Sequence, residues 1–236
     1  MPTSGLPLFP PSMSSGFEKT LNIALVIAAV AVAALVAKRE LWPSAKVSAQ
    51  PAAAGPRFVD DWRKMQAAAH TLGSRSAPVS IIEFVDMQCP YCARFHQTLS
   101  KVLEARGGAV SYSFVHLPLP GHPHALSAAR AVECARIQQR FSRFLDVAFA
   151  KQDSIGRKTW PSFAAEAGVA DTISFGRCAR DTSAVPMIQA GIALAEEHNV
   201  RATPTFVLNG WLYSGAPTES QLDRAIDRLL QGKDPR

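Results

Sequence analysis

The sequence predicts an α/β fold with an inserted helical segment, preceded by one hydrophobic N-terminal helix. A β-branched apolar run leads into a helix and a second strand over residues 79–117. A helical pattern then continues from about 124 to 198, and a short hairpin and a last helix follow over 205–230. Strands and helices in this order fit one mixed α/β domain.

The composition is that of a folded protein. The 236 residues are 47% hydrophobic and 19% charged, which leaves enough apolar side chains for a sizeable core. The net charge of +6 comes from lysine and arginine residues that are scattered along the chain. We therefore expect no nucleic-acid partner, because binding to nucleic acid would favour a clustered basic patch.

A hydrophobic segment precedes the predicted domain. Residues 1–17 are rich in Pro, Ser and Gly and form a predicted tail, and Leu21–Ala37 has Asn22 as its only polar side chain. An apolar helix of this length spans roughly 25 Å, close to the ~30 Å hydrocarbon core of a bilayer. We interpret residues 18–39 as an uncleaved membrane anchor. A cleaved signal peptide and a buried soluble helix are the alternatives.

The charges beside this segment conflict with the orientation that the cysteines favour. Lys38 and Arg39 follow the segment, and the positive-inside tendency would leave the next domain in the cytoplasm. Glu40 is adjacent, however, so the charge difference is small, and an even number of cysteines fits an oxidising compartment. We expect the domain in the periplasm or another extracytoplasmic space, either anchored or, after signal cleavage, secreted.

A linker is predicted between this segment and the domain. Residues 40–57 contain several prolines and an Ala-rich run with little periodicity. The spacing of Val59, Trp62 and Met65 then predicts a short amphipathic helix. We expect the domain to occupy residues 58–236.

The motif Cys89-Pro90-Tyr91-Cys92 lies between the predicted strand Val79–Val85 and a helical pattern. The first turn of a helix offers unpaired N–H groups and the positive end of the dipole, which stabilise a thiolate at Cys89. Cys92 lies one turn further and can resolve a mixed disulfide formed at Cys89. Pro90 stiffens the loop, and Tyr91 adds bulk for a contact.

The same two cysteines could instead form half of a zinc site. Zinc requires four ligands in a compact set, and the remaining cysteines, Cys134 and Cys178, are single and far apart in the sequence. We therefore expect no metal and no cofactor, and a redox-active cysteine pair.

The remaining elements follow from their patterns. Residues 110–117 alternate as a second strand, and a proline-rich loop precedes the helical region. Asn209-Gly210 is a strong hairpin signal between two short β-prone runs. Thr218 and Gln221 form a predicted capping box at the start of the last helix.

Two motifs in order carry a resemblance to a known family. The sequence Glu-Phe-Val-Asp-x-x-Cys-Pro-Tyr-Cys begins at Glu83, and Ala-Thr-Pro-Thr-Phe-Val-Leu-Asn-Gly occupies 202–210. Over roughly Gly73–Leu230 the chain resembles DsbA-like thiol–disulfide oxidoreductases of the thioredoxin superfamily. The resemblance implies a thioredoxin-like fold with a helical insertion at about 120–198. It also implies a cis-proline loop in which Thr203 and Pro204 face the cysteines and bind an extended substrate, although most X–Pro bonds are trans.

Glu83 and the distant cysteines also gain an expected role from the resemblance. A carboxylate in an apolar strand is unfavourable unless it is paired or protonated, and the resemblance implies that Glu83 helps Cys92 to exchange its proton. A solvent-facing strand residue is the alternative. Cys134 and Cys178 could be separate thiols, whereas the resemblance implies a structural disulfide. We assign no catalytic role to the histidines near the motif, His96, His116, His122 and His124.

The sequence therefore predicts a thiol–disulfide oxidoreductase that introduces disulfides into reduced or unfolded extracytoplasmic proteins. We expect it to be a monomer. The resemblance implies reoxidation by a membrane partner, a quinone-linked thiol oxidase. The alternatives are a reductase or isomerase with the same motif, and a non-enzymatic, membrane-tethered binding module.

Overall fold

The structure is a computed structural model that describes residues 25–30, 55–67, 69–183 and 185–236. The chain divides after Ala54 into two units. In the first, residues 25–30 are helical and their large side chains are exposed. The predicted tail and most of the predicted anchor and linker lie outside the described residues. Within the described ranges, no helix is long and apolar enough to cross a membrane, and the anchor stays a prediction.

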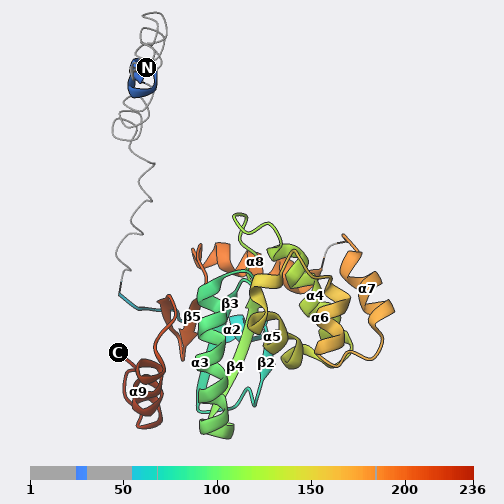
Figure 1. Ribbon diagram of the computed structural model, residues 1–236. Helices are drawn as coiled ribbons and strands as arrows, with labels where there is room; N and C mark the ends of the chain where they lie inside the picture. Colours follow the sequence, from blue (N-terminus) through green and yellow to red (C-terminus); the bar gives the residue numbers. More distant parts are fainter. Residues whose placement is uncertain (1–24, 31–54, 68, 184) are drawn as a thin grey trace, which may run out of the picture. The chain divides into compact units, whose positions relative to one another are not determined.

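A six-stranded sheet forms the centre of the second unit, in the order β1-β6-β5-β3-β4-β2 (Figure 1). The strands β3 and β4 are parallel, and every other neighbouring pair is antiparallel. All seven residues of β3 are buried, as expected for a strand that is covered on both faces. The strand bounds are Arg57–Phe58 (β1), His70–Leu72 (β2), Val79–Val85 (β3), Val110–His116 (β4), Thr205–Leu208 (β5) and Trp211–Ser214 (β6).

The longer strands match the sequence predictions, and the two shortest were missed. The strands β1 and β2 contain two and three residues, too few to give a period-two pattern. Arg57, which the sequence placed in the linker, pairs with Leu212 in β6 and so belongs to the sheet.

Alternation along β3 assigns its side chains to two cores. Val79, Ile81 and Val85 face the helices α3 (Pro90–Arg106) and α9 (Glu219–Leu230). Ile82 and Phe84 face the other core, which includes residues of α2 (Trp62–Ala67) and α8 (Pro186–Glu197). The predicted capping box is present at the start of α9. By the same alternation, Glu83 lies on the face that α3 covers.

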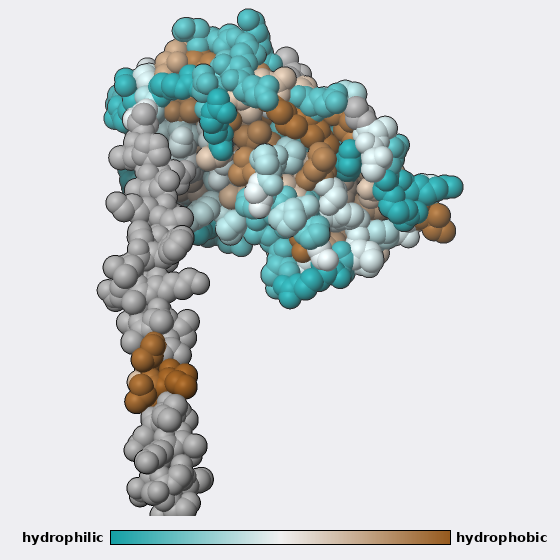
Figure 2. All heavy atoms as spheres, turned by 90° about the horizontal axis from the view of Figure 1, so that it is seen from above, coloured by the Kyte–Doolittle hydropathy of each residue, from teal (hydrophilic) through white to brown (hydrophobic). Residues whose placement is uncertain are grey.

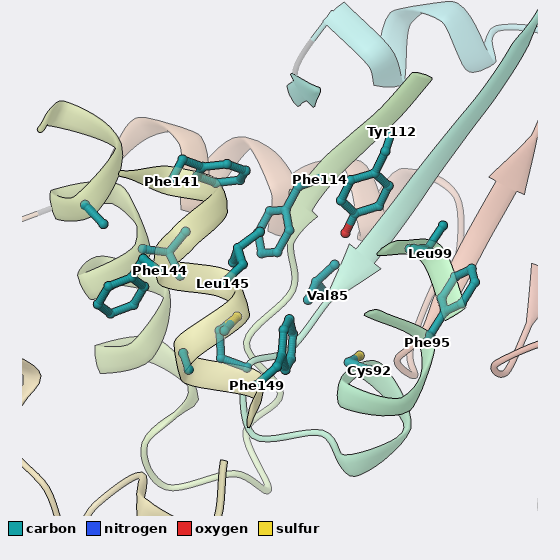
Figure 3. Packing of buried hydrophobic residues seen from close by; sticks show 14 of the residues in the cluster. Val85, Cys92, Phe95, Leu99, Tyr112, Phe114, Phe141, Phe144, Leu145 and Phe149 are labelled. Carbon is teal, nitrogen blue, oxygen red and sulfur yellow. The ribbon is translucent and has the colours of Figure 1, made fainter. Parts of the chain in front are cut away.

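The helical region predicted between the strands is confirmed as helical. It contains α4 (Ala125–Ile137), α5 (Phe141–Ala150), α6 (Trp160–Glu166) and α7 (Thr172–Arg180), with α8 after them. Cys134 in α4 and Cys178 in α7 form a disulfide with a Cα–Cα distance of 5.9 Å. Figure 3 shows how Phe144, Leu145 and Phe149 of α5 continue the core of the sheet into this region.

Candidate active site

Cys89 is the residue from which α3 begins. Its backbone is extended (φ −73°, ψ 118°), and Pro90 follows at the first helical position. An N–H at that position has no partner within the helix, so a proline there costs no hydrogen bond. The Cys89 carbonyl accepts from the Ala93 N–H at 3.2 Å. The local sequence thus delivers the sulfur to a helix N-terminus that lies directly after the buried strand β3.

The second motif lies against this sulfur. The Thr203–Pro204 peptide bond is cis and immediately precedes β5. In the thiol form, Cys89 Sγ donates to the Thr203 carbonyl oxygen at 3.2 Å. Two motifs that are 114 positions apart in the sequence are therefore in direct contact.

The surroundings of Cys89 favour its thiolate. A hydrogen bond with the Cys92 thiol is the largest influence and, with the Thr203 side chain and the backbone N–H groups of Tyr91 and Cys92, lowers the pKa of Cys89 from 9.0 to about 5. Burial, which leaves Cys89 only 4% exposed, acts in the opposite direction. The Thr203 hydroxyl has no hydrogen-bond partner among the described residues, so it is available to the sulfur once Cys89 ionises.

Cys92 has the opposite character. It is fully buried within the core and lies beside Phe95 (Figure 3). Burial, followed by the hydrogen bond to Cys89 and the nearby charge of Glu83, raises the pKa of Cys92 far above its ordinary value. One sulfur is therefore ready to react at neutral pH, and the other stays protonated behind it.

Glu83 is buried, as the strand pattern suggested, rather than facing solvent. The Tyr112 hydroxyl donates to Glu83 Oε2 at 2.8 Å, and Oε1 has no partner among the described side chains. Burial is the main cause that raises the pKa of Glu83 from 4.5 to about 8, and the charge of Cys89 adds to it. The charge of Glu83 is in turn one of the causes that raise the pKa of Cys92.

Asp86 supports the loop in a way that the sequence did not reveal. Asp86 lies between β3 and α3, and its carbonyl accepts from the Cys89 N–H at 3.1 Å. Its buried carboxylate also accepts from the N–H groups of Gln88 (2.7 Å) and Leu119 (2.8 Å) and contacts His122 Nδ1 at 2.7 Å. Asp86 thus joins the active-site loop to the loop after β4.

Gln152 is a second supporting residue that no sequence signal identified. Its amide Nε2 donates to the carbonyl oxygens of Met87 and Cys89, each at 2.9 Å. We expect Gln152→Ala to lower the free energy of unfolding by about 1–3 kcal/mol, because two partly buried carbonyls lose a donor. Chemical denaturation would measure this. A change below about 0.5 kcal/mol would show that water replaces the amide.

The side chain of Tyr91, in the Cys-Pro-Tyr-Cys motif, and those of His96 and His116 contact groups other than the two sulfurs. Tyr91 is 55% exposed, and the Arg94 guanidinium lies 5.0 Å from the centre of its ring. His96 contacts Asp146 at 2.9 Å, and His116 contacts Glu133. The two side-chain groups with the spacing of metal ligands, His70/His116/Glu133 and Asp61/Glu197/His198, contain neither site cysteine, among the residues that the structure describes.

Comparison with known proteins supports the assignment of the fold. A family model described as "Thioredoxin" matches residues 66–228. Among curated proteins, the chain is 32% identical over 163 residues to a Na(+)/H(+) antiporter NhaA of Herminiimonas arsenicoxydans, which covers 69% of this chain and 26% of that protein. A Na(+)/H(+) antiporter NhaA 1 of Mycolicibacterium gilvum is 30% identical over 161 residues, which are 67% of this chain and 26% of the antiporter. The chain spans about a quarter of the length of these relatives.

Solved structures give the same result over most of the chain. A thioredoxin-like oxidoreductase from Silicibacter pomeroyi is 27% identical with a TM-score of 0.60, covering 72% of this chain and 98% of that one. DsbA2 of Pseudomonas aeruginosa is 27% identical with a TM-score of 0.50 and coverage of 66% and 91%. BdbD of Bacillus subtilis, at 20% identity, TM-score 0.64 and coverage of 76% and 99%, shares the fold.

Proposed function

The chain belongs to the thioredoxin family and is a DsbA-like member of that superfamily, and from this premise we propose that it oxidises thiols in client proteins. Thiol–disulfide exchange in general is supported by the family model and by the similar solved oxidoreductases. The observation that carries the finer proposal is the contrast between the two sulfurs, a stabilised thiolate at Cys89 and a protonated thiol at Cys92.

The reaction begins with the Cys89–Cys92 pair as a disulfide. A client thiolate attacks Cys89 Sγ, the S–S bond breaks, and a mixed disulfide forms between client and Cys89, while Cys92 leaves as a thiolate and takes a proton. A second client thiolate attacks the client sulfur and releases Cys89. The client gains a disulfide, and both electrons remain with the two cysteines as a dithiol.

Glu83 supplies or accepts the proton of Cys92 in this scheme. Cys92 is buried, so its thiolate is unfavourable until a proton reaches it. A carboxyl with a pKa of about 8 is mostly protonated at neutral pH and can still ionise, which suits an acid that works in both directions. Thr203 and Pro204, opposite Cys89, form the surface on which we place an extended client segment.

The direction of the reaction follows from the stability of the reduced state. Stabilisation of the Cys89 thiolate favours the dithiol over the disulfide, so the disulfide form is a strong oxidant.

Tyr91, exposed beside the sulfur, belongs to the contact surface for clients. Figure 2 shows hydrophobic atoms gathered in the middle of one face of the globular unit, a feature that suits unfolded clients.

We further propose that the domain works in the periplasm or another extracytoplasmic space. The Cys134–Cys178 disulfide supports this, because such bonds persist in oxidising compartments. The anchor at 18–39, the domain at 58–236 with its insertion at about 120–198, and a membrane quinone-linked partner for reoxidation complete this proposal.

The experiment that tests the direction is equilibration of the purified protein with glutathione mixtures. We expect a reduction potential at the oxidising end of the family, about −120 to −180 mV. Stoichiometric oxidised protein should also convert a reduced, unfolded two-cysteine client into its disulfide form. A potential near about −270 mV, as in thioredoxin, would instead identify a reductase.

A further inference from the structure

A second cluster of buried polar side chains lies outside the cysteine site. His70 Nε2 and His116 Nε2 lie 2.6 Å and 2.8 Å from the same atom, Glu133 Oε1. The side chains of His116 and Glu133 are 1% and 6% exposed, and that of His70 is 16% exposed. Because burial of so many polar groups is unfavourable unless they are satisfied, this cluster calls for an explanation.

The three side chains meet because of the sheet register. His70 in β2 pairs with Phe114 in β4, so the two residues point to the same face. His116 is two positions after Phe114 and therefore points to that face as well. Glu133 comes from α4, so three separate elements supply the three groups.

We propose that His70, His116 and Glu133 bind one divalent transition-metal ion of the zinc class. Two imidazole nitrogens and one carboxylate oxygen form a common protein ligand set for Zn²⁺, with a fourth position left for water. The three ligand atoms all lie within 4.8 Å of one another, so one ion can reach them all.

The distances require only a small adjustment. Two ligand atoms that are each about 2.0–2.1 Å from one tetrahedral zinc ion lie about 3.3 Å apart. The present separations of 2.6 Å and 2.8 Å suit hydrogen bonds, so Glu133 Oε1 has to withdraw by about 0.7 Å from His70 Nε2 and by about 0.5 Å from His116 Nε2. Both imidazoles then carry their proton on Nδ1 and bind through Nε2.

Arg136 holds the carboxylate in the orientation that this requires. Its Nε donates to Glu133 Oε2 at 3.0 Å, which leaves Oε1 directed at the histidines. Hydrogen-bonded second oxygens of this kind orient carboxylate ligands. The Arg136 side chain is 44% exposed, so water screens its positive charge from an ion in the cluster.

The disulfide next to Glu133 fixes one side of the cluster. Glu133 directly precedes Cys134, whose disulfide to Cys178 joins α4 to α7. Glu133, Arg136 and both cysteines line a cavity of about 380 Å³. The proposed ligands join β2, β4 and α4, and His70, whose side chain is 16% exposed, is the most accessible of the three.

Titration with Co²⁺ and Zn²⁺ tests the site directly. The full chain should carry Cys89→Ser and Cys92→Ser, so that thiolates do not bind the metal, and should first be treated with a chelator. We expect one ion per chain, with the visible absorption bands of tetrahedral Co²⁺ lost on addition of Zn²⁺. His70→Gln should weaken binding at least about tenfold, because the glutamine amide preserves the hydrogen bond to Glu133 but ligates poorly.

A matched control comes from the partly exposed group Asp61/Glu197/His198. His198→Gln should leave the affinity within about twofold, and circular dichroism should show that both variants are folded. Absence of Co²⁺ and Zn²⁺ binding, equal affinity in His70→Gln, or loss of binding in His198→Gln would each overturn the proposal and leave the cluster as a hydrogen-bond network.

Discussion

Cys89→Ser is expected to reduce the rate of thiol–disulfide exchange by about 10³-fold or more, because a serine hydroxyl neither ionises at neutral pH nor forms a disulfide. The fold should be unaffected, since sulfur and oxygen differ little in size and the contact with the Thr203 carbonyl can be kept. The rate of oxidation of a reduced, two-cysteine client measures the loss.

Cys92→Ser is the matched variant with a different expected outcome. Cys89 can still form a mixed disulfide, but no second sulfur lies beside it to resolve the adduct. We expect covalent client adducts that survive denaturing electrophoresis and disappear on addition of reductant. If both serine variants kept the exchange activity of the unsubstituted protein, neither sulfur would have a role in exchange, and a non-enzymatic binding module would be favoured.

Glu83→Gln is expected to make stability less dependent on pH. In the folded protein Glu83 stays protonated up to about pH 8, whereas the unfolded chain ionises it above about 4.5. The folded state therefore binds more protons within this window, and the stability of the unsubstituted protein falls as the pH rises from about 4.5 to about 8. The decline should reach a few kcal/mol, since each pKa unit corresponds to about 1.4 kcal/mol.

Chemical denaturation of the reduced protein at pH 5 and pH 8 measures this effect. The glutamine can still accept from the Tyr112 hydroxyl, so Glu83→Gln should gain stability relative to the parent at pH 8 and little at pH 5. Glu104→Gln is the control, because Glu104 is exposed in α3 and its charge stays in water. The same difference between parent and Glu83→Gln at both pH values would mean that Glu83 titrates alike in the folded and unfolded chains.

The elements of the fold that have a strong local signal were predictable from the sequence. The buried run of β3 and the Asn209-Gly210 turn have strong local signals, and the capping box of α9 was confirmed with the expected partners. The strands β1 and β2 have too few residues for such a signal and exist because β6 and β4 offer free edges for pairing.

Some residues of the candidate site were likewise predictable from the sequence, and others were not. Cys89 and Thr203 were identified by motif, and the structure places them in contact. Gln152 and the buried carboxylate of Asp86 were missed, because their role depends on which loops the fold brings beside the cysteines. A glutamine in a helical region and an aspartate in a turn are common on protein surfaces, so residue type and spacing give no sign of this role.

The ionisation of Cys89 is the central claim, and the rate of alkylation of the reduced protein as a function of pH measures it most directly. Cys92 does not interfere, because its pKa lies far above the ordinary value. The account predicts that the reactive thiol titrates with a pKa of about 5. A pKa near the ordinary 9.0 would contradict it, because a thiol held by the helix N-terminus and by Cys92 could not then be favoured as a thiolate.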